Sequence, residues 1–402
     1  MQEVCGIIVE WNPFHNGHRA ILQAIRSHHP QAVVIALMSG NYVQRGEVAI
    51  LSKWERAKMG VKYGADLVFE LPFWQAVQPA DGFSRGGVEA LAALGVQTLV
   101  FGSEVADFKP YQVLADWLAN HQKQVEGAWQ ERKGPRGDFA RDRLQFLYDF
   151  CQKEEELKEL TIDFQNRSNT LLAFRYAKAN ADLHSSMRLE AFKREKHYDF
   201  LSEGVELLSS SQIRHSLSQH LPASSLGESL PREMAEALDQ TPRLGFLASC
   251  YPYLRYTLLT HTRPQLARYY QVYEGIEGVL QEAAKTCDTY EDFLEKVVNK
   301  RWTRYRIQRA LVMVLLQVEE EEMVCFQNLR QPLVLLGATK RGRSYLKDLK
   351  KQSHSRYSIL SRIGQAEEKQ WPLAVRADQF YQQFVMKSDQ SQVFGRTPYL
   401  RD

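Results

Sequence analysis

The chain has 402 residues and a formal net charge of +3, from 51 lysines and arginines against 48 acidic residues. This length suffices for two sizeable cores, and the composition is ordinary for a soluble protein. Apolar stretches such as Ala310–Leu316 are far shorter than the roughly 20 residues that cross a bilayer, and Met1-Gln2-Glu3 lacks the basic start of a secretory signal. We therefore expect a cytoplasmic protein with no membrane segment.

Cysteine and histidine spacing gives no sign of a metal site. The 5 cysteines are scattered and include no Cys-x-x-Cys pair, and no His-Glu-x-x-His segment occurs. These patterns are the usual signatures of zinc sites, and a disulfide framework would need pairable cysteines. We expect reduced thiols and no zinc.

Apolar, β-rich runs occur at residues 4–9, 32–37, 67–71, 98–101 and 188–192, separated by segments with helical spacing. This alternation predicts an α/β fold with a parallel sheet and crossover helices. The composition shifts near residues 221–231, and helical patterns dominate beyond them. We expect a Rossmann-like domain at 1–220 and a mainly helical domain at 221–402. A helical insertion at 105–167, with the basic turn Lys133–Gly137, suits a lid or an RNA-contacting loop.

The segment His15-Asn16-Gly17-His18 follows the first expected strand directly, and helical spacing continues from Arg19. In open α/β sheets, nucleotide phosphates bind where a strand ends and a helix begins. Gly17 permits close approach of a phosphate to the backbone, and imidazoles can donate to its oxygens. The pattern favours nucleotidyl transfer with release of pyrophosphate. The alternative is a pair of solvated loop histidines.

Three serines and an arginine open a later helical pattern at Ser209–Arg214. Serines can cap a helix, and Arg214 can reach a phosphate. The alternative is a plain helix cap with a surface arginine. A third segment, Gln44 to Glu47 after the second expected strand, could bind an acid substrate or an acceptor base, or be a structural loop.

The second half of the chain carries a local excess of basic residues. From Lys300 to Arg356 there are 13 lysines and arginines and 5 acidic residues. In Lys300–Arg309 the cations surround Trp302 and Tyr305, a mixture that suits RNA with exposed bases. The alternative is an amphipathic helix with inward aromatic rings. Lys340 and Arg341 begin a basic turn without the spacing of a phosphate loop.

Taken in order, several segments resemble the bacterial tRNA(Met) cytidine acetate ligase family. The matching segments are Glu10–His18, Met38–Glu47, Gly64–Pro72, Phe101–Glu104, Ser168–Leu171, Ser209–Arg214 and Lys300–Arg309. The histidine tetrapeptide alone marks the wide nucleotidyltransferase superfamily that includes class I aminoacyl-tRNA synthetases. The block from Met38 to Glu104 is specific to the ligase family.

The resemblance implies a Rossmann-like nucleotidyltransferase domain that makes acetyl-adenylate from acetate and ATP. The acetyl group would pass to N4 of the wobble cytidine of elongator tRNA(Met), giving N4-acetylcytidine, AMP and diphosphate. ATP would be a co-substrate, and any Mg²⁺ would accompany it. We expect no obligate protein partner.

The residues implied for catalysis are His15, His18 and Arg214. Those implied for ATP binding are Ile7, Ile8, Val9, Glu10, Trp11, Asn12, Pro13, Phe14, His15, Asn16, Gly17, His18, Arg19, Ala20, Gly102, Asn169, Arg194, Ser210, Ser211 and Arg214. Those expected to contact tRNA are Lys300, Arg301, Arg304, Arg306, Arg309, Lys340 and Arg341. Around Arg194 the chain departs from the family pattern, because Lys193–Asp199 is shorter and lacks a glycine.

Two other functions fit parts of the pattern. An adenylyltransferase acting on a phosphorylated small molecule would use the same histidine loop and arginine, although many such enzymes are shorter. A non-catalytic RNA-binding protein could retain a nucleotide pocket, but the intact histidine pair and Arg214 argue against it. A pyrophosphate-release assay with acetate separates both from the ligase.

Overall fold

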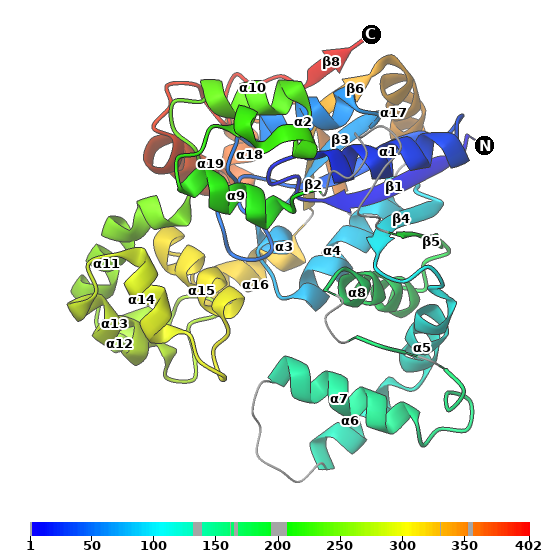
Figure 1. Cartoon of the computed structure of the whole chain (residues 1–402), viewed down its shortest axis with the longest axis horizontal. Coiled ribbons are helices and arrows are strands. Elements are labelled where there is room, and N and C mark those ends of the chain that lie inside the picture. The colour runs from blue at the N-terminus through cyan, green and yellow to red at the C-terminus, as the bar shows by residue number, and fades with distance from the viewer. Residues whose placement is uncertain are drawn as a thin grey trace.

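The computed structural model describes residues 2–131, 139–160, 162–164, 168–193, 207–329, 331–352 and 357–402. Figure 1 shows a sheet with helices on both faces and a further group of helices beside it. The expected basic turn Lys133–Gly137 and the expected ATP ligand Arg194 lie outside the described residues. Every helix in the described part is too short or too polar to span a bilayer.

The first part of the sheet consists of parallel strands, and each matches an apolar run expected from the sequence. The strands are β1 (Val4–Val9), β2 (Val33–Ser39), β3 (Leu67–Leu71), β4 (Thr98–Ser103) and β5 (Arg188–Lys193). They lie in the order β5-β4-β1-β2-β3, which confirms the α/β fold. The carboxyl ends of these strands meet at one edge, so the loops after β1, β2 and β4 gather there.

The chain returns to this sheet near its end. Strand β6 (Gln331–Thr339) pairs antiparallel with β3, and β7 (Tyr357–Leu360) and β8 (Tyr399–Arg401) both pair parallel with β6. The expected division between 1–220 and 221–402 stays a prediction. The structure adds that the second part is not helical throughout, because β6, β7 and β8 all belong to it and extend the sheet of the first part.

Alternate residues of the central strands face two different cores. In β2, Val34, Ala36 and Met38 pack on one side of the sheet, while Val33, Ile35 and Leu37 pack on the other. This period of two is what a strand buried on both faces requires. The side of Val34 is covered by α1 (Asn16–His28), α2 (Lys53–Lys62), α9 (Ser210–Ser218) and α10 (Arg232–Gln240).

The opposite side of the sheet carries the insertion between β4 and β5. This side of the sheet is covered by α4 (Ala80–Ala93), α5 (Lys109–Asn120), α8 (Ser168–Asp182) and α17 (Lys340–Gln352). Helices α6 (Gln122–Glu131) and α7 (Phe139–Cys151) extend from α5 and project below the sheet in Figure 1. The described part of the expected insertion at 105–167 is therefore mainly helical.

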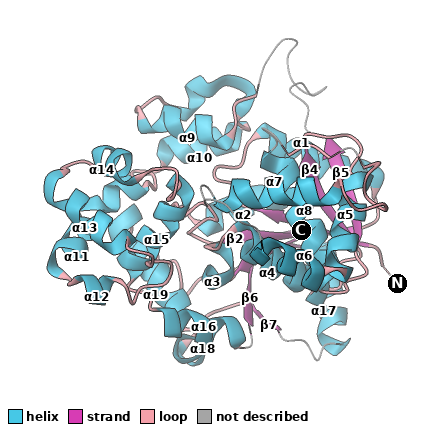
Figure 2. Cartoon of the chain, turned by 90° about the horizontal axis from the view of Figure 1, so that it is seen from below, coloured by secondary structure: helices cyan, strands magenta, loops and turns pink. Residues whose placement is uncertain are grey.

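A third core belongs to a helical lobe, residues 251–328, which Figures 1 and 2 show beside the sheet. Its central helix, α15 (Arg304–Leu316), is buried from Ile307 onward. The same core includes Tyr42 and Val48 from the loop after β2, so the lobe packs directly against that loop. The other lobe helices are α11 (Tyr251–Thr260), α12 (Arg263–Leu266), α13 (Ile276–Thr286), α14 (Tyr290–Val297) and α16 (Glu320–Asn328).

Candidate active site

The histidine loop, residues Asn12–His18, joins β1 to α1, and its two imidazoles cap the helix. The N-cap residue is His15, whose Nδ1 accepts from the Gly17 N–H at 3.0 Å, while His18 Nδ1 accepts from the His15 N–H at 3.2 Å. The two rings stack with centroids 3.7 Å apart. Since both Nδ1 atoms accept, the neutral rings carry their protons on Nε2. An Nε2–H group is a donor suited to a phosphate oxygen at the helix start.

Gly17 is required by the position of the His15 ring. A Cβ atom at residue 17 would lie 2.9 Å from His15 Cε1, so any side chain would displace the imidazole. Two buried polar atoms of the loop, Asn12 Nδ2 and Asn16 Oδ1, have no hydrogen-bond partner within the part of the chain that the structure describes. Buried polar atoms are normally paired, so these two suit a loop that binds a polar ligand.

The serine–arginine segment lies against the histidine loop. Ser209 caps α9, Ser210 Oγ lies 3.4 Å from the Pro13 carbonyl oxygen, and Arg214 Nη1 donates to the Asn12 carbonyl at 2.7 Å. The other guanidinium nitrogen of Arg214, Nη2, lies 2.8 Å from Glu47 Oε2. The fold therefore brings three distant segments into one group of contacts.

Glu47 belongs to the Arg45 loop, residues Asn41–Ile50, which follows β2. A bridge between Tyr42 and Val48 closes this loop, and the Gln44 N–H donates to Glu10 Oε1 at 2.7 Å. Burial raises the pKa of Glu10, although the Gln44 N–H and the guanidinium groups of Arg45 and Arg214 act in the opposite direction. A carboxyl group with a raised pKa thus adjoins the end of β1.

Gly102 and Asn169 lie at the same edge of the sheet as the histidine loop. Strands β1 and β4 pair Ile7 with Val100, so Gly102 follows at the carboxyl edge. Asn169 lies in the first turn of α8 beside Glu104, and its Nδ2 donates to Glu104 Oε1 at 2.6 Å. Burial raises the pKa of Glu104, but hydrogen bonds from Thr170 and Asn169 outweigh it and lower the pKa. Glu104 therefore orients Asn169.

Several residues of the expected ATP site are core residues. Ile7, Val9, Trp11 and Phe14 are each at most 7% exposed and pack in the core beneath the histidine loop, and Ala20 of α1 is also buried. Their side chains hold the loop in place, so any contact with a nucleotide would come from their backbone. Ile8 is half-buried on the opposite side of the sheet, beside Gly87.

The expected RNA-contacting residues do not form a single surface. Lys300, Arg301 and Arg304 are exposed at the start of α15. Arg306 lies beside them, with Nη2 2.9 Å from Glu274 Oε2. Arg309 is buried, its Nε donates to Gln271 Oε1 at 3.2 Å, and burial lowers its pKa to about 10. Because Arg309 is buried, it cannot belong to an RNA-facing surface, and the expectation that it contacts tRNA is wrong in this structure.

Lys340 and Arg341 are exposed at the opposite edge of the sheet. Strand β6 runs antiparallel to β3 and pairs Ala338 with Leu67, so its end lies where the parallel strands begin. Accordingly, Arg341 Nη1 lies 3.2 Å from the carbonyl oxygen of Ala32. These two cations are therefore separated from the histidine loop by the length of the sheet.

Comparisons with known proteins agree with the fold. A family model described as HIGH Nucleotidyl Transferase matches residues 1–395. A tRNA(Met) cytidine acetate ligase of Lactobacillus delbrueckii subsp. bulgaricus is 36% identical, and one of Streptococcus pneumoniae is 34% identical, each over 98% of both chains. The chain belongs to the tRNA(Met) cytidine acetate ligase family. The crystal structure of Thermotoga maritima TmcAL bound with alpha-thio ATP matches with a TM-score of 0.83 at 28% identity, over 99% of both chains.

Membership of the ligase family confirms the resemblance seen in the sequence, while the roles of individual residues stay predictions.

A buried polar group that the sequence did not predict lies behind the Arg45 loop. Lys53 Nζ lies 2.6 Å from Glu70 Oε2 and also donates to Asp378 Oδ2. Burial raises the pKa of Glu70 to about 7, because one ammonium group cannot neutralise two buried carboxylates. Asp378 lies more than 300 positions from Lys53, so no local pattern could have indicated this contact.

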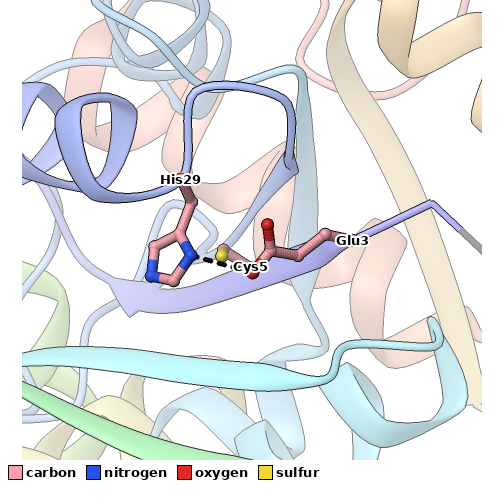
Figure 3. A group of neighbouring side chains, drawn as sticks. All are labelled: Glu3, Cys5 and His29. Atoms are coloured by element: carbon pink, nitrogen blue, oxygen red, sulfur yellow. Dashed lines mark hydrogen bonds and ion pairs between the residues drawn. The ribbon is translucent and has the colours of Figure 1, made fainter.

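A second polar group, also unexpected, lies at the start of β1. Figure 3 shows Glu3, Cys5 and His29, whose potential metal-ligand atoms all lie within 4.8 Å of one another. His29 Nδ1 is 2.8 Å from Glu3 Oε1, and its Nε2 is 2.8 Å from Glu190 Oε2. Burial lowers the pKa of His29, but the two carboxylates outweigh it and raise the pKa. Because β1 runs from this group to the histidine loop, the group is not part of the candidate active site.

Proposed function

We propose that this chain acetylates N4 of the wobble cytidine of elongator tRNA(Met), using acetate and ATP through an acetyl-adenylate. The observation that carries the proposal is the contact of the histidine loop with Arg214 at the sheet edge that also holds Gly102. Family membership agrees with it. ATP and tRNA occur together in the cytoplasm, so we propose that the reaction takes place there, without an obligate protein partner.

In the first step, an acetate oxygen attacks the α-phosphorus of ATP. The bond from that phosphorus to the bridging oxygen breaks, and diphosphate leaves with the electron pair. No protein nucleophile is needed, so the protein has to align the reactants and stabilise the developing charge. The Nε2–H groups of His15 and His18 are donors for this charge, and the guanidinium of Arg214 faces the same loop.

The carboxylates near the histidine loop are already engaged by the protein. Glu10 accepts from the Gln44 N–H, and Glu47 pairs with Arg214. Mg²⁺ prefers carboxylate, phosphate and water oxygens, and it commonly binds through substrate phosphates. We therefore propose that any Mg²⁺ is held chiefly by ATP itself, where it would neutralise phosphate charge.

In the second step, cytidine N4 attacks the acetyl carbonyl carbon. The bond between this carbon and the phosphate oxygen breaks, AMP leaves with the electron pair, and N4 gives up one proton to water. A base in an anticodon loop is already unpaired, so little energy is needed to present it. The exposed cations Lys300, Arg301 and Arg304 are available to the RNA backbone.

The deciding experiment combines purified protein with ATP, labelled acetate and unmodified elongator tRNA(Met), followed by nucleoside mass analysis. The proposal predicts N4-acetylcytidine only when ATP and acetate are both present. Pyrophosphate exchange that depends on a phosphorylated small molecule instead of acetate would point to an adenylyltransferase. RNA binding without any pyrophosphate exchange would indicate a non-catalytic RNA-binding protein.

A further inference from the structure

The Arg45 loop touches both the candidate adenylate site and the basic end of α15. On one side, Glu47 pairs with Arg214 of α9. On the other side, Gly46 packs on the backbone of α15, where a Cβ atom at residue 46 would lie 2.2 Å from the Arg309 nitrogen. Gly46 also has a φ of +74°, so both the close approach to α15 and the backbone conformation require glycine at this position. The loop is therefore fixed between the two regions.

At the tip of this loop, Arg45 connects the two regions through side chains. Arg45 Nη1 lies 3.1 Å from the Tyr305 hydroxyl and 3.5 Å from Ser211 Oγ. Its guanidinium carbon lies 4.9 Å from the centroid of the Tyr305 ring, which is a cation–π distance. Ser210, the neighbour of Ser211, contacts the Pro13 carbonyl of the histidine loop. Tyr305 is thus linked to that loop by a short series of contacts.

The Tyr305 ring is held in place yet open to solvent. It is 42% exposed, although most aromatic side chains of the lobe are buried in its core. The exposed cation Arg304 precedes it, and Arg306 lies 5.1 Å from the ring centroid of Tyr273, which is 49% exposed. Flat rings next to guanidinium groups are the usual means by which proteins hold unpaired RNA bases.

We propose that Arg45 and Tyr305 position the acceptor base of the RNA substrate beside the acyl-adenylate. The Tyr305 ring stacks on the base, and the Arg45 guanidinium donates to its carbonyl oxygen or ring nitrogen. This inference rests on the proposed function, which supplies the reaction that the base undergoes. It assigns to Arg45 and Tyr305 a positioning role distinct from the attraction of the RNA backbone by Lys300, Arg301 and Arg304.

The test compares Tyr305→Ala, Tyr305→Phe and Arg45→Lys with Tyr256→Ala, a control that removes an exposed tyrosine of α11. Acetate-dependent pyrophosphate exchange without RNA should stay within twofold of wild type in Tyr305→Ala, Tyr305→Phe and Tyr256→Ala. Single-turnover transfer from preformed acetyl-adenylate to saturating tRNA should fall at least tenfold in Tyr305→Ala and Arg45→Lys. Tyr305→Phe keeps the ring and should stay within threefold, and Tyr256→Ala should be unchanged.

A second measurement does not depend on catalysis. An anticodon stem-loop carrying the fluorescent base pyrrolocytosine at the wobble position should change its emission on binding wild type, and Tyr305→Ala should lose this change. If Tyr305→Ala keeps both the emission change and the transfer rate, the positioning role is wrong. If it loses only RNA affinity, with transfer at saturation unchanged, the residue is an ordinary RNA contact and the proposal also fails. If wild type makes no acetyl-adenylate but shows the Tyr305-dependent emission change, the proposed function is wrong, while the stacking of the base on Tyr305 is confirmed.

Discussion

Arg214 donates to the Asn12 carbonyl with one nitrogen and lies 2.8 Å from the Glu47 carboxylate with another. Two fixed partners hold the planar guanidinium in one orientation, which a lysine ammonium cannot reproduce. The Arg214 side chain is 15% exposed, so its charge acts in a partly desolvated setting where it is less screened. A guanidinium held in this way is prepared for a phosphate before the nucleotide arrives.

Replacing Arg214 with lysine should lower acetate-dependent pyrophosphate exchange by about 10- to 100-fold, because the charge remains but the two-point geometry is lost. Glu47→Gln should have a smaller effect, about tenfold or less, since the Asn12 contact persists. Arg232→Lys is the matched control, because Arg232 is an exposed arginine on α10 that pairs with Glu236. Equal exchange rates in Arg214→Lys and Arg232→Lys would contradict the assigned role.

His18→Ala should reduce pyrophosphate exchange by about 10²- to 10³-fold, as expected for the loss of one donor to the developing charge. The cost in stability should be about 1–2 kcal/mol, because the variant loses a helix-capping hydrogen bond and the stacking of the His18 ring on His15. His28→Ala, an exposed histidine at the other end of α1, serves as the control. Full activity of His18→Ala would remove the histidine loop from the catalytic machinery.

Lys53→Met should destabilise the fold by about 3–5 kcal/mol, because two buried carboxylates would lose the ammonium group between them. Lys62→Met removes a lysine from the same helix, but its side chain is 40% exposed in its pair with Glu233. A surface pair of this kind is worth about 0–1 kcal/mol. Urea unfolding followed by circular dichroism compares the two variants, and similar midpoints would show that the buried group contributes little.

The raised pKa of Glu70 predicts a pH dependence of stability. In the folded protein this pKa is about 7, against an ordinary value of 4.5, so between these values the folded state binds more protons than the unfolded state. The free energy of unfolding should therefore fall as the pH rises through this range, by up to about 1.4 kcal/mol per pH unit from this group. Urea unfolding at several pH values should give a flatter profile for Glu70→Gln than for wild type. Parallel profiles would mean that Glu70 ionises normally.

Changing Arg301, Arg304 and Arg306 together to glutamine should weaken tRNA binding and make its salt dependence less steep, by up to about 2–3 in log–log slope. ATP-dependent exchange without RNA should be unaffected. Lys340 and Arg341 lie at the far edge of the sheet, so changing both to glutamine should alter tRNA affinity less than the triple change. Fluorescence titrations at several salt concentrations decide this. A larger loss in the double variant would place the RNA on the far side of the sheet.

The parallel half of the sheet was predictable because its signals are local. Val4–Val9 and Leu67–Leu71 are short apolar runs with helical patterns on either side, and both became strands at those bounds. Strand β8 was not expected, because it is only three residues long and depends on pairing with β6. The place of β6 next to β3 joins residues far apart in the chain, and neither segment alone indicates the other.

The candidate site likewise has parts that the sequence indicates and parts that it does not. The histidine loop and Arg214 could be predicted because strand ends, helix starts and phosphate-binding residue types are visible in short windows. The burial of Arg309 could not, because it depends on the approach of Gly46 and on the amide of Gln271. The contact of Arg45 with Tyr305 likewise arises only when the helical lobe packs against the loop after β2.

The return of β6 to pair with β3 has a consequence for biosynthesis. The amino-terminal strands and the whole helical lobe emerge from the ribosome before β6 does. The outer edge of β3 therefore remains unpaired through most of translation. An open strand edge is a template for pairing with other chains. The nascent protein therefore keeps this open edge until β6 has emerged, and a chain that ends before residue 331 lacks the strand that pairs with β3.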